Sequence, residues 1–274
     1  MVDVIGEIKP TRIFHFAAQA INSISFGMPE LSLDTNIRGT MNILEAIYRN
    51  KLNELTKVLL AGSSTEYGRS TSNVEINSIS EDLPLDPVSP YGISKLGTEK
   101  VANHYIVTHN MKIVTARIFI HIGVGGTDSL AVNQFCRQIA LAELGLQPPI
   151  LSHGTLTTYR DISDAKDSAS AIIALLEMGK SGEAYNVGSG NKIQMKHILD
   201  VALSLSKVNF TTKESPSLLR SFDENSLVAN IDKLKALTGW TPKSNMTRVT
   251  GEILNYWREK ERYLHCRKDG DCNT

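Results

Sequence analysis

The sequence predicts an α/β fold built on a doubly wound parallel sheet, because short apolar runs alternate with segments of helical periodicity. Three runs, Arg12–Ala17, Lys57–Ala61 and Lys112–Arg117, have the composition of strands that are buried on both faces. Helical patterns at 31–50 and 91–110 separate them. Ligands of such sheets bind beyond the carboxyl ends of the strands, so we expect the functional residues there.

The two helices are predicted by different signals. The segment 31–50 carries an apolar stripe at helical spacing, formed by Leu33, Ile37, Met41, Leu44 and Ile47. The helix at 91–110 is expected to begin at Ser89 and Pro90, since serine is a favoured N-cap and proline a favoured first helical residue. A long polar loop at 69–88 precedes it.

The order of elements becomes mixed after about residue 128, which predicts a second, smaller lobe. Further helices are expected near 129–145, 164–179, 192–206 and 245–263. We therefore divide the chain into a sheet domain at 1–125 and a mixed α/β lobe at 126–263 that is interleaved with it. The polar residues 264–274 are predicted to form a disordered tail.

Composition excludes several classes of partner. The 274 residues carry no net charge, which gives no electrostatic case for binding nucleic acid or an anionic membrane. The apolar runs are too short to cross a bilayer. The three cysteines, Cys136, Cys266 and Cys272, lack the spacing of metal ligands, so we expect a reduced, cytoplasmic protein without a structural metal.

Tyr91 and Lys95 are candidates for acid/base chemistry because residues four apart share one face of a helix. The ammonium and the positive helix N-terminus both favour the phenolate, so we predict a lowered pKa for Tyr91. Ser63 could then hold a substrate oxygen against it, with Ser64 as the alternative, since neighbours at a strand end point to opposite sides. The spacing alone is weak evidence, because Tyr256-x-x-x-Lys260 repeats it without a serine-rich turn.

Several short motifs accompany this pair in a fixed order along the chain. They are His15-Phe-Ala-Ala-Gln19, Asn36-Ile-Arg-Gly-Thr40, Ser63-Ser64, Tyr91-x-x-x-Lys95, Arg160-Asp161 and Tyr185-Asn-Val-Gly188. From about residue 8 to 257 the chain resembles the NAD-dependent epimerase/dehydratase family, the extended short-chain dehydrogenases/reductases that act on nucleotide sugars. Ser63-Ser-Thr-Glu-Tyr-Gly68, His121-Ile-Gly123 and Leu219-Arg220 are most similar to GDP-4-keto-6-deoxymannose reductases, then to GDP-mannose 4,6-dehydratases.

The resemblance implies a Rossmann-like fold, a homodimer formed through the helices at 31–50 and 91–110, and roles for single residues. Tyr91 would donate the proton, Lys95 would tune Tyr91 and hold the cofactor ribose, and Ser63 would orient the carbonyl. Contacts to NADP or NAD are implied for Ala17, Ala18, Asn36, Tyr91, Lys95, Phe119 and His121. Contacts to the nucleotide sugar are implied for Ser64, His121, Arg160 and Arg220.

Each of these roles has a simpler alternative. Ala17 and Ala18 could serve only tight packing, and Asn36 could be an ordinary exposed residue. Either arginine could form a surface ion pair, and His121 could be a satisfied loop residue.

Glu66 decides between two reactions. The related dehydratases place a carboxylate in this turn to remove the C5 proton, two residues before the tyrosine of the Tyr-Gly pair. Counted back from Tyr67, that position holds Thr65, whereas counted forward from Ser63 and Ser64 it is Glu66. The shorter turn favours reduction of a GDP-4-keto-6-deoxyhexose at C4. Dehydration or epimerisation with Glu66 as the base remains the alternative.

The glycine-rich turn that normally cradles a dinucleotide pyrophosphate has no counterpart before His15. The expected sheet therefore lacks its N-terminal strands, and the residue that selects NAD or NADP is not in the sequence. An edge exposed at Arg12–Ala17 would favour aggregation. A third reading follows, in which the chain is a cofactor-free inactive form or a partner subunit.

Overall fold

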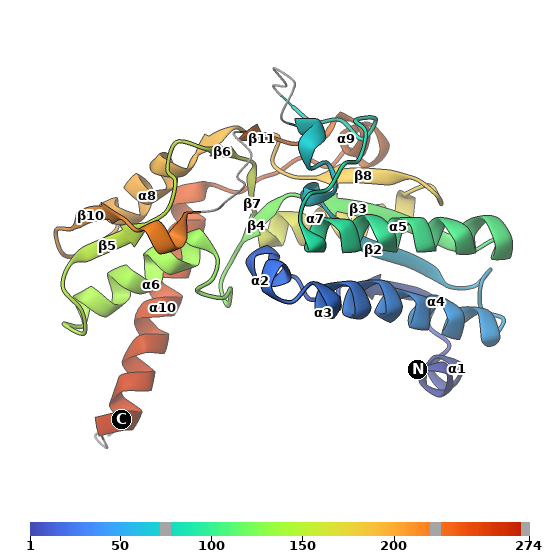
Figure 1. Cartoon of the computed structure of the whole chain (residues 1–274), viewed down its shortest axis with the longest axis horizontal. Coiled ribbons are helices and arrows are strands. Elements are labelled where there is room, and N and C mark those ends of the chain that lie inside the picture. The colour runs from blue at the N-terminus through green and yellow to red at the C-terminus, as the bar shows by residue number, and fades with distance from the viewer. Residues whose placement is uncertain (72–77, 220–225, 270–274) are drawn as a thin grey trace.

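The computed structural model describes residues 1–71, 78–219 and 226–269, which form two lobes (Figure 1). Arg220 lies outside the described residues. The helices are α1 Val2–Ile8, α2 Asn22–Gly27, α3 Pro29–Leu33, α4 Gly39–Arg49, α5 Pro90–His109, α6 Ala131–Glu143, α7 Ala165–Met178, α8 Met195–Ser204, α9 Asp232–Thr238 and α10 Met246–Asp269. The strands are β1 Arg12–His15, β2 Lys57–Ser63, β3 Lys112–Ile118, β4 Ile120–Ile122, β5 Ile150–His153, β6 Tyr159–Arg160, β7 Ile162–Asp164, β8 Ala184–Val187, β9 Ile193–Gln194, β10 Thr211–Glu214 and β11 Ser226–Leu227.

The first lobe is a four-stranded parallel sheet in the order β1-β2-β3-β8. An apolar cluster joins one face of the sheet to α1, α4 and α5, and a second cluster joins the other face to α7 and α9. Helices therefore cover both faces, as the alternation of apolar runs and helical patterns predicted. Parallel pairing brings the carboxyl ends of β1, β2 and β3 to one edge of the sheet.

Strand β1 differs from the prediction of a buried strand through Ala17. It ends at His15 and pairs only with β2, so it forms an edge of the sheet among the described strands. His15 is 7% exposed, whereas Phe14 and Phe16 are 43% and 48% exposed. Helices cover one face of β1 and leave the side chains of the other face in solvent.

The predicted helix 31–50 is helical throughout but not one regular α-helix. A π-helical turn, η1, at Asp34–Arg38 separates α3 from α4. A π turn adds a residue and rotates the helix face that follows. Met41 is therefore 42% exposed, contrary to the predicted stripe. The buried face consists of Ser32, Asn36, Thr40, Leu44 and Ile47.

The second lobe packs α6, α8 and α10 into a separate apolar core, beside short strand pairs (Figure 1). Strand β4 pairs with β7, β5 with β10, and β6 lies between β9 and β11. Helix α10 continues to Asp269, so residues 264–269 are helical, where a disordered tail was predicted. Within the described chain, no helix combines the length and apolar character needed to cross a membrane.

Candidate active site

The start of helix α5 places Tyr91 and Lys95 beside the end of β2. The Ser89 Oγ accepts a hydrogen bond from the Gly92 N–H at 3.0 Å, and Pro90 follows as the first helical residue, as predicted. Gly92 permits a close approach to the serine-rich turn, since a Cβ there would lie 2.6 Å from the Thr65 carbonyl oxygen. The sequence thus fixes both the helix start and its contact with the turn.

Ser63 forms the N-cap of the short 3₁₀ turn η2, Ser64–Glu66. Its Oγ accepts hydrogen bonds from the Thr65 N–H at 3.2 Å and from the Thr65 Oγ1 hydroxyl at 2.9 Å. The Ser63 hydroxyl keeps its own proton for donation, and it lies close enough to Tyr91 to act on the pKa of the phenol. Ser63 is therefore the serine that the structure brings to Tyr91, as the preferred assignment required.

Tyr91 has a raised pKa, contrary to the predicted direction. Burial raises the pKa of Tyr91 to about 12, and the nearby Ser63 hydroxyl opposes this shift only in part. The Lys95 ammonium lies 5.8 Å from the Tyr91 ring centroid and donates to the Ala61 carbonyl at 2.8 Å. Tyr91 is thus a neutral phenol near pH 7, which suits a proton donor.

Lys95 is the cation of the site and is only 6% exposed. Burial lowers its pKa to about 8. Its positive charge also reaches His15, whose pKa falls to about 4, first through burial and then through Lys95. A second cation is disfavoured here, so His15 is neutral at physiological pH.

Asn36 joins the end of β1 to α5. Its Oδ1 accepts from the Gln19 N–H at 2.8 Å, and its Nδ2 donates to the Ser94 Oγ at 2.8 Å and the Gln19 carbonyl at 3.2 Å. The side chain is 2% exposed, so it is not an ordinary exposed residue. These bonds favour a role in positioning the residue next to Lys95 over direct contact with a cofactor. The Asn36 carbonyl accepts from Thr40, which in turn accepts from the neutral His15.

The other predicted contact residues lie at or near the strand ends. Ala17 is exposed and Ala18 half-buried, directly after β1. His121 is exposed on β4, but nearby protein partly desolvates its ring and lowers its pKa. Phe119 is 4% exposed and packs in a cluster with Tyr67, so its side chain belongs to the core and is not placed to contact a ligand.

Arg160 and Ser64 are both buried. Arg160, on β6, is 4% exposed, and its Nη1 donates to the Tyr159 carbonyl at 2.7 Å. The adjacent Asp161 accepts hydrogen bonds from the backbone of Ser189, Gly190 and Ala229, so it holds two loops together. Ser64 is 6% exposed at the start of η2.

Glu66 is not placed to act as a base on a substrate. The side chain is 0% exposed, and its Oε1 accepts from the Ser63 N–H at 2.6 Å. Burial and Glu99 raise its pKa well above the ordinary value. The carboxyl faces the interior beneath Gly62, where a Cβ would lie 2.8 Å from Oε1. Its assignment as a catalytic residue is therefore wrong for this structure.

Sequence reasoning missed a polar network beneath the turn. Arg117 donates to both carboxylate oxygens of Glu99 at 2.9 and 3.0 Å and to the Tyr67 hydroxyl at 3.2 Å. Tyr67 donates in turn to the Asn186 Oδ1 at 2.7 Å. One signal was present, since Arg117 is a charged residue within an apolar strand.

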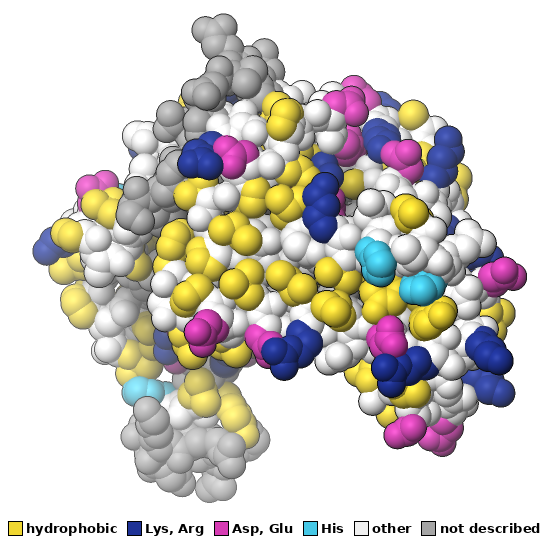
Figure 2. Space-filling view, turned by 45° about the vertical axis from the view of Figure 1, so that its right-hand side comes forward, with side chains coloured by type: hydrophobic (Ala, Val, Ile, Leu, Met, Phe, Trp, Pro, Cys, Tyr) yellow, Lys and Arg dark blue, Asp and Glu magenta, His cyan; other side chains and the backbone are white. Residues whose placement is uncertain are grey.

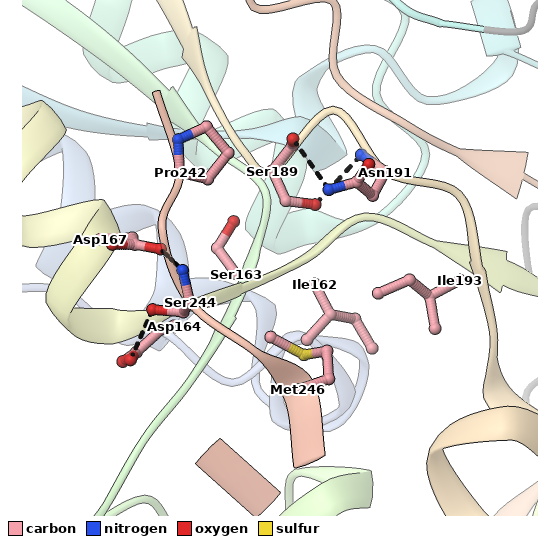
Figure 3. Close-up of a pocket in the computed structure, with 10 residues that line it drawn as sticks. All are labelled: Ile162, Ser163, Asp164, Asp167, Ser189, Asn191, Ile193, Pro242, Ser244 and Met246. Atoms are coloured by element: carbon pink, nitrogen blue, oxygen red, sulfur yellow. Dashed lines mark hydrogen bonds between the residues drawn. The ribbon is translucent and has the colours of Figure 1, made fainter. Parts of the chain in front are cut away.

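A small pocket beside β7 contains none of the predicted site residues (Figure 3). Three of its polar residues are bonded to one another, since Asp167 accepts from the Ser244 N–H at 2.8 Å and Ser244 donates to Asp164 at 2.9 Å. The end of β2 with Ser63, together with Tyr91 and Lys95 at the start of α5, remains the candidate active site.

A family model described as GDP-mannose 4,6 dehydratase matches residues 1–253. The chain belongs to this family. Membership confirms the resemblance drawn from the motifs, and with it an enzyme of the extended short-chain dehydrogenase/reductase type.

Individual members of the family show the same relationship. GDP-6-deoxy-D-mannose reductase of Pseudomonas aeruginosa is 29% identical over 95% of the chain and 85% of the relative. GDP-mannose 4,6 dehydratase 2 of Caenorhabditis elegans is 24% identical over 93% of the chain and 70% of the relative. The structure of RMD from P. aeruginosa complexed with NADPH superposes with a TM-score of 0.86 at 28% identity, covering 95% of this chain and 86% of that one. The Rossmann-like fold class is thereby confirmed.

Proposed function

We propose that the chain is an NAD(P)-dependent nucleotide-sugar oxidoreductase that reduces a GDP-linked 4-keto-6-deoxyhexose at C4. The similarity to a GDP-6-deoxy-D-mannose reductase, and to a reductase structure that contains NADPH, supports this choice. The chain is also similar to the dehydratase and to a UDP-glucose 4-epimerase of Thermus thermophilus, which was solved with NAD and is 25% identical. Dehydration and epimerisation of a nucleotide sugar therefore stay as the alternative reactions.

The position of Glu66 carries the choice of reduction over dehydration. Elimination of water requires a base for the C5 proton, and the carboxyl nearest the triad is buried beneath the turn. The position that faces the site in related dehydratases holds Thr65, whose hydroxyl donates to Ser63. Reduction needs only an acid, and the neutral Tyr91 supplies one.

The described residues fit the reactive end of a nicotinamide cofactor. Small side chains at Ala17 and Ala18 leave the end of β1 open to a ligand, and the buried cation Lys95 lies beside Tyr91. The described residues ahead of β1 form helix α1, so they supply no glycine-rich turn for the pyrophosphate. When bound, NADPH or NADH supplies the hydride that C4 accepts.

The residues of the chain supply the rest of the reaction. Ser63 donates to the C4 carbonyl oxygen and holds it next to Tyr91. The Tyr91 hydroxyl gives its proton to that oxygen as the alcohol forms, and Lys95 stabilises the phenolate that remains. We propose that Arg160 and His121, with Arg220 and Ser64, bind the nucleotide sugar, because arginine can bind phosphate oxygens in pairs.

The test is turnover by the purified chain. GDP-4-keto-6-deoxymannose should be consumed with NADPH or NADH, followed as loss of the absorbance of the reduced nicotinamide. Conversion of GDP-mannose into a 4-keto product would instead support the dehydratase alternative. A folded chain that neither turns over substrate nor quenches or shifts NADPH fluorescence would support the cofactor-free reading.

We also propose that two chains associate through α4 and α5. Met41 and Tyr48 on α4, and Ile93 and Val107 on α5, are between 42% and 76% exposed. Figure 2 shows hydrophobic side chains gathered in a band across this face. Exposed apolar bands of this kind mark interaction surfaces.

Val107→Glu tests the dimer, because Val107 is the most exposed of the four at 76%. We expect sedimentation velocity to show a dimer for the wild-type chain and a monomer for the variant, since a charge would be buried in the interface. Ile173→Glu is the matched control: Ile173 is 56% exposed on α7, on the opposite face of the sheet, and should not change the mass. A wild-type monomer at micromolar concentration would contradict the proposal.

Cys136 and Cys266 are free thiols in the structure, and Cys136 is buried. Free thiols are typical of reducing compartments. We propose a cytoplasmic location on this basis.

A further inference from the structure

The Glu66 carboxyl has one oxygen bound and one without a donor. Oε1 accepts from the Ser63 N–H at 2.6 Å. Oε2 is also buried, and no donor within the described residues reaches it. A buried carboxylate oxygen without a hydrogen bond is costly, so the observation requires a physical explanation.

Another carboxyl lies next to this one. Glu99, on α5, is close enough to Glu66 to raise its pKa. Glu99 is 13% exposed and forms a two-pronged ion pair with Arg117, itself 8% exposed. The pair borders a polar groove that includes Lys100 and Lys233 but not Glu66.

Two carboxylates in contact away from water cannot both remain ionised. The ion pair with Arg117 fixes the negative charge on Glu99. The titratable and charged groups facing Glu66 are Glu99, Lys95 and Tyr91 from α5 and Arg117 from β3. Lys95 and Arg117 are cations that favour an ionised Glu66, but burial and the neighbouring Glu99 outweigh them.

We propose that Glu66 is a positioning residue that works as a neutral carboxylic acid, accepting from the Ser63 N–H and donating its own O–H to Glu99. The inference rests on the proposed function in one respect only, namely that Ser63 takes part in the reaction. The acid group fastens the serine-rich turn to α5 and, through Arg117, to β3. It thereby holds the Ser63 hydroxyl against Tyr91. The distance between these two side chains must stay constant during proton transfer.

The protonation state has a measurable consequence for stability. Burial and Glu99 raise the pKa of Glu66 in the folded chain, whereas in the unfolded chain it ionises at about the ordinary value of 4.5. A raised folded pKa means that the unfolded state releases its proton first. The contribution to stability is therefore complete below about pH 4.5 and is lost as the pH rises towards the folded pKa.

Glu66→Gln is the decisive variant, because glutamine accepts and donates in the same places and cannot ionise. Thermal and urea unfolding of the full chain should be measured from pH 5 to pH 8. We expect Glu66→Gln to gain on the wild type by about tenfold in the unfolding equilibrium constant for each pH unit until the pH reaches the folded pKa of Glu66. A difference that is constant with pH, or that favours the wild type as the pH rises, would show an ionised Glu66 and overturn the proposal.

Glu143→Gln is the matched control. The Glu143 side chain is also shielded, at 7% exposed, but it accepts two hydrogen bonds from Arg258 at 2.7 Å, and its pKa is lowered. Its contribution to stability is present above the unfolded pKa and is lost at acid pH. The wild type should therefore be more stable than Glu143→Gln at pH 7, and this difference should shrink towards pH 4, the opposite trend to Glu66→Gln.

Activity separates positioning from stability. Glu66→Leu leaves the buried Ser63 N–H without an acceptor, so kcat should fall about 10–100-fold with little change in KM. Glu66→Gln should restore kcat to nearly the wild-type value. Equal loss in both variants would contradict the positioning role. If the wild-type chain shows no reductase activity but the unfolding trends hold, the proposed function fails and the neutral acid stands.

Discussion

The chain contains two tyrosine–lysine pairs with the same spacing and very different surroundings. In Tyr91–Lys95 the ammonium lies 5.8 Å from the ring centroid, and in Tyr256–Lys260 it lies 5.4 Å away. Both pairs share a helix face, as the spacing predicts. Lys95 is buried at the end of β2, whereas Lys260 is half-buried and also lies 4.4 Å from the Trp257 ring centroid.

The difference shows that neighbouring elements, not the spacing, make the first pair reactive. Tyr91 meets the hydroxyl of Ser63, a proton donor for a substrate oxygen, and Lys95 meets a backbone carbonyl of the sheet. Tyr256 and Lys260 lie on α10 against the aromatic ring of Trp257 in the core of the second lobe. Burial shifts the pKa of both members of the first pair towards their neutral forms.

Removing the two phenol hydroxyls should give the largest contrast. Tyr91→Phe should lower kcat by about 10²–10⁴-fold, the usual contribution of a general acid, because the variant loses the phenol that protonates the C4 oxygen. Tyr256→Phe should leave kcat unchanged. The comparison is made by steady-state turnover of GDP-4-keto-6-deoxymannose. Comparable losses in both variants would mean that the position of the first pair has no special role.

Removing the cations should give a smaller contrast with a distinct pH dependence. Lys95→Met should lower kcat about 10–100-fold, because the phenolate left after proton transfer loses its nearest positive charge. In the wild type, kcat should fall as the pH rises above about 8, where Lys95 loses its charge. Lys260→Met should retain both the rate and this pH profile. A wild-type profile that is flat from pH 7 to pH 9.5 would contradict a role for the Lys95 charge.

The features that the sequence could predict are those that short segments specify. Apolar runs predicted β2 and β3, and Ser89-Pro90 predicted the start of α5. The π turn before Met41 was not predictable from the apolar stripe; Asn36 within it binds Gln19 and Ser94, which are distant in sequence. Local patterns do not report such contacts.

The residues of the triad were predictable from the sequence, whereas their electrostatics were not. Ser63, Tyr91 and Lys95 could be named from motif order, whereas the raised pKa of Tyr91 could not. The prediction counted the charge on Lys95 and omitted burial, which outweighs it. The role of Glu66 was missed because nothing in the turn shows that Glu99 and Arg117 lie beneath it.

The smallest expected effects concern stability, where the two lysines should act in opposite directions. Burial lowers the pKa of Lys95 to about 8 in the folded chain, against 10.5 when unfolded, so the unfolded state binds the proton more tightly. Stability therefore rises with pH between about 8 and 10.5 as this penalty disappears. At pH 7, Lys95→Met should be more stable than the wild type by about 1–3 kcal/mol, after allowance for the lost bond to Ala61.

Lys260→Met should instead be less stable than the wild type by about 0.5–1 kcal/mol, because it loses contact with two aromatic rings. Urea unfolding at pH 7 and pH 10 measures both differences. The advantage of Lys95→Met should shrink at the higher pH, while the deficit of Lys260→Met should change little. If Lys95→Met were less stable than the wild type at pH 7, burial of the Lys95 ammonium would carry no net cost in stability. The two tyrosine–lysine pairs would then differ only in their position.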